Sequence, residues 1–178
     1  GPSVLELTQQ LLAELDLSAD EAAEETKSAG TAEVQAKQGL EGLAETEIDR
    51  WIIRLNPSPK ARIRLFCFAY MGAGASLYNS WVDTLPSDIE LCSVQLPGRE
   101  ERAGETPIEN IEELTEKLTR IFLKLTDKPF AIFGHSFGAR IAFLVASRLE
   151  QEHQIKPRFL FLAGSLPPHV ENPIQKAV

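Results

Sequence analysis

Residues 130–138, Phe-Ala-Ile-Phe-Gly-His-Ser-Phe-Gly, contain the pattern that decides the fold. An apolar run of strand length, residues 130–133, ends immediately before Gly134, and residues 137–150 have the apolar spacing of a helix. Ser136 therefore lies where a strand turns into a helix within one residue. The sequence predicts a sharp turn between strand and helix, with Ser136 in a strained backbone conformation at its apex.

The residues around Ser136 suit a nucleophile. Gly134 and Gly138 leave room for neighbouring backbone, so that the hydroxyl of Ser136 projects from the turn. The N–H of Phe137, at the start of the helix, would lie beside a developing oxyanion, where the positive end of the helix dipole also acts. The alternative is a serine that only caps the helix of an ordinary strand–helix unit. Because both flanks fit, we favour the nucleophile, with His135 as part of the motif.

Strands and helices alternate on both sides of this turn. Such alternation predicts an α/β fold with a parallel sheet and flanking helices. The expected strands are residues 63–69, 89–96, 130–133 and 159–163. Two of the expected helices are residues 78–85 and 137–150. A third helix is expected to begin at a capping box, residues 106–109, with Pro107 in the first helical position.

A glycine-rich loop, residues 69–74, follows the first of these strands. Neither a Lys-Ser/Thr pair nor an acidic residue placed for a ribose follows it, which argues against nucleotide binding. A second oxyanion donor is expected from such a loop, and the N–H of Met71 is our candidate. A simple tight turn is the alternative.

Composition excludes several classes of function. The net charge of −8 argues against non-specific binding of nucleic acid, and no apolar run is long enough to span a membrane. The three histidines lack ligand-like spacing to Cys or Asp, so no zinc motif is present. Cys67 and Cys92 lie in expected strands and are interpreted as small core residues. A cytoplasmic location fits best.

The charge is concentrated in residues 1–50, which contain twelve Asp or Glu and three Lys or Arg. Residues 1–17 are expected to contain one amphipathic helix, about residues 4–15, begun by a capping box at Ser3 and Glu6. Residues 18–50, rich in Ala, Glu, Gly, Lys and Gln, are interpreted as an acidic flexible linker. Residues 51–178 form the nearly neutral body.

Three motifs give the body a family resemblance. Residues 68–76 (FAYMGAGAS), 95–100 (QLPGRE) and 134–139 (GHSFGA) resemble, in order and spacing, the type II-like thioesterases of polyketide synthases and nonribosomal peptide synthetases. The segment 166–169 (LPPH) is similar to the one after the next strand of that family, and the match covers residues 62–172. The first motif departs from the family at Ala69, where Pro is usual, and at Met71, where Ala is usual. A backbone donor tolerates both changes, although Met71 has the bulk to narrow the acyl entrance.

The resemblance implies an α/β-hydrolase fold that needs no cofactor of its own. Its substrate would be an acyl chain on the phosphopantetheine of a partner, either an acyl carrier protein or a peptidyl carrier domain of the same synthase. Residues 1–7 (GPSVLEL) resemble the start of the last helix of an acyl carrier protein, although Gly1-Pro2 is also what tag removal leaves. A thioesterase placed after a carrier mildly favours product release over editing.

The family implies a catalytic Asp and then a His, many tens of residues beyond the serine. Only 42 residues follow Ser136, so we expect the front portion of the domain, without its lid and last strands. His135 is expected in the packing beside the sheet, His153 at a helix end and His169 in the approach to the lid, none of them as general base. Strand 159–163 is then an edge strand that invites association, unless further chain follows.

Three hypotheses follow for function. The leading one is a serine thioesterase that acts through Ser136, Met71 and Phe137. The second is a catalytically silent docking or structural module, because the acid and base are absent. The third is an acyltransferase, which shares Gly-His-Ser-x-Gly but is disfavoured by the Pro-Gly-Arg-Glu element at residues 97–100.

Overall fold

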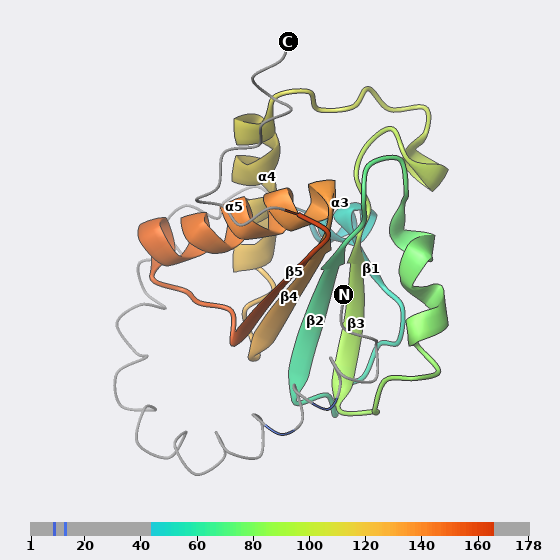
Figure 1. Cartoon of the computed structure of the whole chain (residues 1–178), viewed down its shortest axis with the longest axis vertical. Coiled ribbons are helices and arrows are strands. Elements are labelled where there is room, and N and C mark those ends of the chain that lie inside the picture. The colour runs from blue at the N-terminus through green and yellow to red at the C-terminus, as the bar shows by residue number, and fades with distance from the viewer. Residues whose placement is uncertain (1–8, 10–12, 14–43, 166–178) are drawn as a thin grey trace.

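The computed structural model describes residues 9, 13 and 44–165 of the chain, and a five-stranded sheet forms its centre (Figure 1). The strand order is β1-β3-β2-β4-β5. In chain order the elements are α3 (Glu45–Trp51), β1 (Ile52–Arg54), β2 (Ile63–Phe68), the 3₁₀ helix η2 (Ala75–Trp81), β3 (Ile89–Val94), the 3₁₀ helix η3 (Glu100–Arg102), α4 (Ile111–Leu123), β4 (Phe130–His135), α5 (Phe137–His153) and β5 (Phe159–Ala163).

The sheet is mixed. Strands β3, β2, β4 and β5 run parallel, as the alternation of strands and helices predicts, and the expected α/β fold with flanking helices is confirmed. Strand β1 pairs antiparallel with β3 at the edge. It is three residues long and follows α3 directly, so no period of apolar residues could reveal it.

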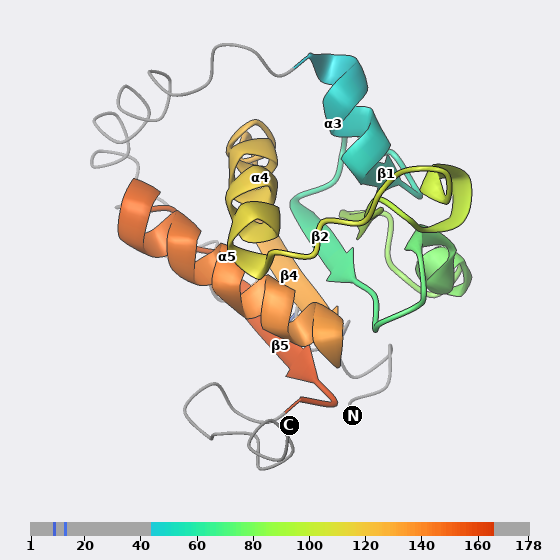
Figure 2. The same ribbon diagram turned by 90° about the horizontal axis from the view of Figure 1, so that it is seen from above.

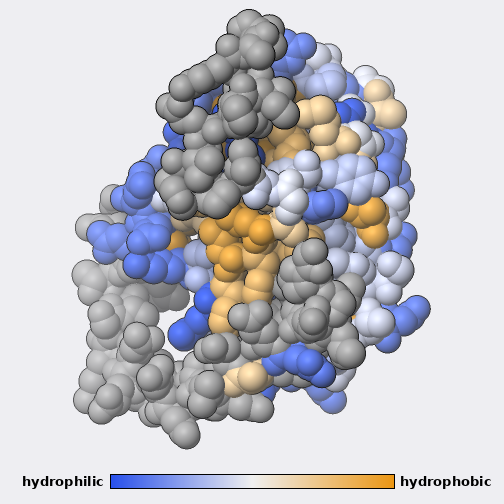
Figure 3. Space-filling view, in the orientation of Figure 1, coloured by the Kyte–Doolittle hydropathy of each residue, from blue (hydrophilic) through white to orange (hydrophobic). Residues whose placement is uncertain are grey.

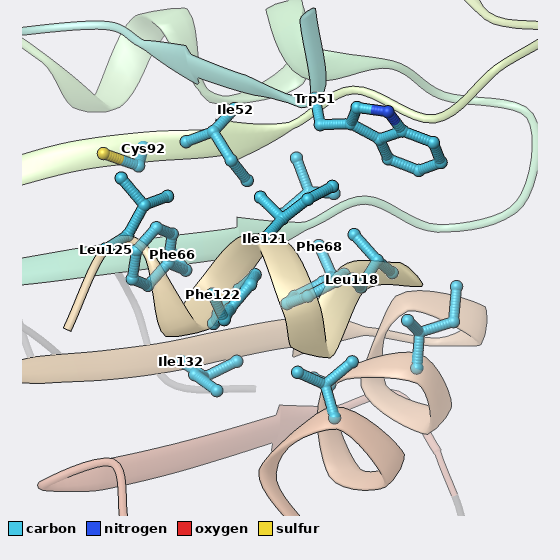
Figure 4. Packing of buried hydrophobic residues seen from close by; sticks show 14 of the residues in the cluster. Trp51, Ile52, Phe66, Phe68, Cys92, Leu118, Ile121, Phe122, Leu125 and Ile132 are labelled. Atoms are coloured by element: carbon cyan, nitrogen blue, oxygen red, sulfur yellow. The ribbon is translucent and has the colours of Figure 1, made fainter. Parts of the chain in front are cut away.

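Side chains of the parallel strands point alternately to two apolar layers. One layer contains Phe66, Phe68 and Ile132 with the buried faces of α3, α4 and α5, and the rings of Phe66 and Phe122 lie 4.3 Å apart between centroids (Figure 4). The other layer contains Leu65, Cys67 and Phe133 with Tyr78 of η2. Seen from above, α4 and α5 lie together on one side of the sheet (Figure 2).

The outer part of the second layer is apolar at the surface. Phe159 and Phe161 of β5 are partly buried and stack with centroids 5.9 Å apart. Apolar side chains are visible over β4 and β5 in the view of Figure 3. Within the described residues β5 pairs only with β4 and is therefore an edge strand.

The predicted capping box at residues 106–109 is wrong. Helix α4 begins at Ile111, and the side chain of Asn110 accepts hydrogen bonds from the N–H groups of Glu112 (2.8 Å) and Glu113 (3.2 Å). Pro107 lies instead against Gly98, where a Cβ would be 2.7 Å from the proline ring. The segment predicted as helix 78–85 is a 3₁₀ helix that begins earlier, at Ala75.

The body begins before the expected residue 51. Helix α3 starts at Glu45, so the last residues of the expected linker are helical, and Ile48 is buried with Trp51 in the first apolar layer. Of the expected helix 4–15, Gln9 and Ala13 are described and are helical. The rest of residues 1–43, and the segment 166–178 with His169, lie outside the described residues. Among those described, no helix is both long and apolar enough to cross a bilayer.

Both cysteines are core residues, as predicted. Cys67 and Cys92 are free and fully buried on neighbouring strands. Burial raises the pKa of the Cys92 thiol to about 12 and holds the pKa of the Cys67 thiol well above its ordinary value.

Candidate active site

Ser136 lies at the apex of the turn from β4 to α5. Its backbone has φ 54° and ψ −116°, a conformation that residues with a Cβ rarely adopt. The N–H of Ser136 donates a 2.8 Å hydrogen bond to the carbonyl of Ala163, at the end of β5. The strained apex expected from the sequence is present, and the last described strand helps to hold it.

Gly134 and Gly138 lie at positions where a Cβ atom would clash with neighbouring backbone. A Cβ on Gly134 would lie 2.5 Å from the Cα of Ala139, and a Cβ on Gly138 would lie 2.3 Å from the carbonyl oxygen of Phe68. Real Cβ atoms do not approach backbone so closely. The first turn of α5 therefore packs directly against both its own incoming strand and the end of β2.

The loop after β2 reaches the same edge of the sheet as Ser136. Phe68 pairs with Gly134 in the parallel register, so the two strands end level with each other. The Tyr78 hydroxyl donates a 2.9 Å hydrogen bond to the Phe68 carbonyl and so fixes the start of the loop. Met71 follows in a turn and is 67% exposed, and Gly72 adopts φ 92°.

Among the described residues, neither candidate oxyanion donor has a backbone acceptor for its N–H. Phe137 is the first residue of α5, and the N–H of a first helical residue has no partner within its helix. Within the described part of the chain, the Met71 N–H donates no backbone hydrogen bond. The structure thus brings the Met71 loop and the Ser136–Phe137 turn to one edge of the sheet, both with open donors.

His135 lies at the carboxyl end of β4, beside the turn. Its ring is 5.5 Å from that of Tyr70 in an edge-to-face arrangement. The His135 ring also meets Gly164, where a Cβ would lie 2.8 Å from the His135 Cδ2. His135 therefore joins the Met71 loop to the end of β5 through packing.

The other histidines do not reach Ser136 in the described structure. His153 ends α5, so the length of a 17-residue helix, about 25 Å, separates it from the serine at the other end. His169 lies outside the described residues. In the described structure the Ser136 side chain makes no capping hydrogen bond to α5, and no cluster of three metal-ligating side chains occurs there.

Three residues beside the site could not be singled out from the sequence. Gln95 and Glu100 belong to the motif at 95–100, which served there only to identify the family, and Ser76 is the second residue of η2. In the structure, the side chains of Gln95 and Glu100 contact the far end of the Met71 loop. A motif shows which residue types recur but not which loop they touch, so their contacts required coordinates.

Comparison with known proteins gives consistent matches. A family model described as a thioesterase domain matches residues 63–177. The gramicidin S biosynthesis protein GrsT of Aneurinibacillus migulanus is 38% identical over 125 residues, which are 70% of this chain and 49% of GrsT. The medium-chain S-acyl fatty acid synthase thioesterase of Anas platyrhynchos is 37% identical over 125 residues, 70% of this chain and 50% of that protein.

A solved structure agrees with these relatives. YbtT, a type II thioesterase from the yersiniabactin NRPS/PKS pathway, matches with a TM-score of 0.60 and 28% identity, over 69% of this chain and 50% of YbtT. The chain spans about half the length of the curated relatives it matches.

Proposed function

The chain belongs to the thioesterase domain family, and from this premise we propose that its domain hydrolyses acyl thioesters held on the phosphopantetheine arm of a carrier protein. The relatives named for gramicidin S biosynthesis and for an NRPS/PKS pathway support a role in making polyketides or nonribosomal peptides. The role is either release of the finished product or removal of misloaded acyl groups.

The proposed reaction has two steps. The Oγ of Ser136 attacks the thioester carbonyl carbon, and the N–H groups of Met71 and Phe137 donate hydrogen bonds to the oxyanion that forms. The C–S bond then breaks, and the carrier thiol leaves with a proton. Water attacks the resulting ester, which releases the free acid and restores the Ser136 hydroxyl. A general base must take the serine proton, and we infer that it comes from outside the described residues.

The backbone of Ser136 is the observation that supports this function most directly. A φ of 54° at a residue with a Cβ costs on the order of 1–3 kcal/mol, and such strain gathers at functional sites. A serine that only caps a helix would not need this conformation. Its side chain would accept a hydrogen bond from the first turn of α5, and it makes none.

The same proposal covers partners and organisation. We propose that residues 1–17 end a carrier domain, that an acidic linker leads to α3, and that the body is the front portion of a thioesterase acting within a multidomain synthase. The domain would use no cofactor or metal ion of its own. It would work in the cytoplasm, with neither nucleic acid nor membrane as a partner.

Trapping of the acyl-enzyme tests the function. The intact protein would be mixed with an acyl-carrier thioester and, separately, with a fluorophosphonate, and the mass of the peptide that contains Ser136 would be measured by mass spectrometry. We expect an adduct on Ser136 with each reagent and none in Ser136→Ala. Free acid should appear in the wild type at the rate at which thioester disappears.

Two results would count against the proposal. Adduct formation at another residue, or equal hydrolysis by Ser136→Ala, would remove Ser136 as nucleophile. Transfer of the acyl group to a second carrier faster than release of free acid would instead identify an acyltransferase. A chain that binds acyl-carrier protein but forms no adduct would be the silent docking module.

A further inference from the structure

The loop that presents Met71 is held at both ends. At its start, the Phe68 carbonyl accepts from the Tyr78 hydroxyl and packs against Gly138. At its far end, the backbone N–H groups of Ala75 and Ser76 are bound by side chains from the segment after β3. The turn between these ends, residues 70–73, has one internal backbone hydrogen bond, from Ala73 to Tyr70.

Gln95 forms the first contact at the far end. Its side-chain Oε1 accepts from the Ala75 N–H at 2.6 Å, and its Nε2 donates to the Arg99 carbonyl at 2.7 Å. The side chain is buried, with the residue only 3% exposed. Its main chain is also fixed, because its N–H donates to the carbonyl of Trp51 and its carbonyl accepts from Arg102 Nη1. Gln95 thus ties the loop to a part of the fold that cannot easily shift.

Glu100 forms the second contact. Its carboxylate accepts from the Ser76 N–H with both oxygens at 3.2 Å and from the Ser76 hydroxyl at 2.5 Å. The same carboxylate lies beside Gly74, where a Cβ would be 2.3 Å from its Cδ. The Glu100 backbone has φ 43°, a left-handed conformation in which a residue with a Cβ is strained. The backbone of Glu100 is therefore strained at the residue whose carboxylate binds the loop.

These contacts act on the part of the loop that contains Met71. A donor N–H stabilises an oxyanion only if it is already aimed at it, and a displacement of about 1 Å can cost roughly 100-fold in rate. Glu100 touches the loop through Gly74 and Ser76, three and five residues beyond Met71, and none of its contacts among the described residues is with Ser136. It can therefore affect the chemistry only by fixing where the Met71 N–H points.

We propose that Gln95 and Glu100 are positioning residues that clamp the loop 70–76, so that the Met71 N–H is aimed at the oxyanion site beside Ser136. This inference rests on the proposed thioesterase function and deepens it. It also gives the Pro-Gly-Arg-Glu segment a physical task, since Gly98 and Arg99 lie between the two side chains of the clamp and shape the turn that separates them.

Four variants of the full-length protein test the clamp. Glu100→Ala removes all contacts of the carboxylate, Ser76→Ala removes only the hydroxyl contact, and Glu100→Gln keeps an acceptor oxygen for the Ser76 N–H. Glu101→Ala is the matched control, because it removes the same charge from the exposed neighbouring residue. Each variant would be measured for kcat and KM of acyl-carrier thioester hydrolysis and for amide hydrogen exchange of a peptide that covers residues 69–77.

We expect Glu100→Ala to lower kcat by about 10- to 100-fold with little change in KM, and to speed exchange in the 69–77 peptide. Ser76→Ala should lose less, Glu100→Gln should regain most of kcat, and Glu101→Ala should match the wild type. Wild-type kcat in Glu100→Ala, or a loss in Glu101→Ala as large as the loss in Glu100→Ala, would overturn the clamp. Turnover that survives in Ser136→Ala would instead refute the proposed function, while the exchange measurement still judges whether Glu100 holds the loop.

Discussion

Gly138 and Phe68 touch backbone to backbone. A Cβ placed on Gly138 would lie 2.3 Å from the carbonyl oxygen of Phe68 and 2.5 Å from that of Ala69. The first turn of α5 is therefore seated on the end of β2, and this contact sets the separation between Ser136 and the Met71 loop. Neither carbonyl belongs to a flexible side chain, so the contact cannot relax by a change of rotamer.

Gly138→Ala should consequently damage both stability and the site. We expect a loss of about 1–3 kcal/mol in the free energy of unfolding, measured by urea denaturation, together with slower labelling of Ser136 by a phosphonate. Gly104→Ala is the matched control, because a Cβ at Gly104 meets nothing within 4 Å and its φ is not left-handed. Its stability should change by less than about 0.5 kcal/mol. Equal effects of the two substitutions would contradict the packing described here.

Strain at Ser136 predicts an unusual order of stabilities. Ser136→Ala keeps the Cβ and therefore the strain, whereas Ser136→Gly can adopt φ 54° freely. We expect the glycine variant to exceed the alanine variant by about 1 kcal/mol in the free energy of unfolding, with both inactive. Thermal and urea unfolding of the two variants measure this difference. An alanine variant as stable as the glycine variant would mean that the turn stores no strain.

The true start of α4 can be tested at two residues. Asn110→Ala removes the acceptor of two backbone N–H groups and should cost about 1 kcal/mol of stability. Thr106→Ala, at the position suggested by the capping pattern, should change stability by less than about 0.5 kcal/mol. Urea titrations of both variants suffice. The opposite ranking would restore the helix start expected from the sequence.

The ion pairs of Glu105 predict a dependence on pH. Hydrogen bonds from Arg102 hold the pKa of Glu105 at about 2, below its ordinary value of 4.5, and Arg50 adds a further ion pair at 2.7 Å. A lowered pKa in the folded state stabilises the fold above pH 4.5, and this contribution disappears as the pH falls to about 2. Wild type should therefore exceed Glu105→Gln in stability at pH 7 and match it near pH 2.

Parallel unfolding titrations of Glu101→Gln provide the control for that comparison. Glu101 is exposed on η3, next to Arg102, and in the described residues it has no ion pair. Its stability difference from wild type should stay constant between pH 7 and pH 2. A Glu105→Gln difference that also stayed constant would show that its ion pairs contribute nothing.

The sequence was informative where periodicity and steric demand agree. A strained turn at Ser136 was predicted from the strand 130–133, the glycines at 134 and 138 and the helix from Phe137. The structure contains this turn. The buried strands β2 and β3 were visible as apolar runs because both their faces are covered. Burial of Cys67 and Cys92 followed from the same runs.

Features decided by tertiary contacts were missed. Strand β1 is three residues long, and α3 is stabilised by Ile48 and Trp51 packing under the sheet rather than by a long apolar period. Thr106 and Glu109 fit a capping pattern, yet Pro107 packs against Gly98, the segment is not helical, and Asn110 caps the helix instead. The contacts of Gln95 and Glu100 join segments that only folding brings together.

The hydrogen bond from the Ser136 N–H to the Ala163 carbonyl sets an order of events during synthesis. Chains are made from the amino terminus, and Ala163 leaves the ribosome after the whole of α5. A nascent chain that ends before β5 already holds every residue from Gly134 to Gly138 but lacks the acceptor that secures the serine. The nucleophile therefore reaches its final geometry only after β5 has been translated and has paired with β4.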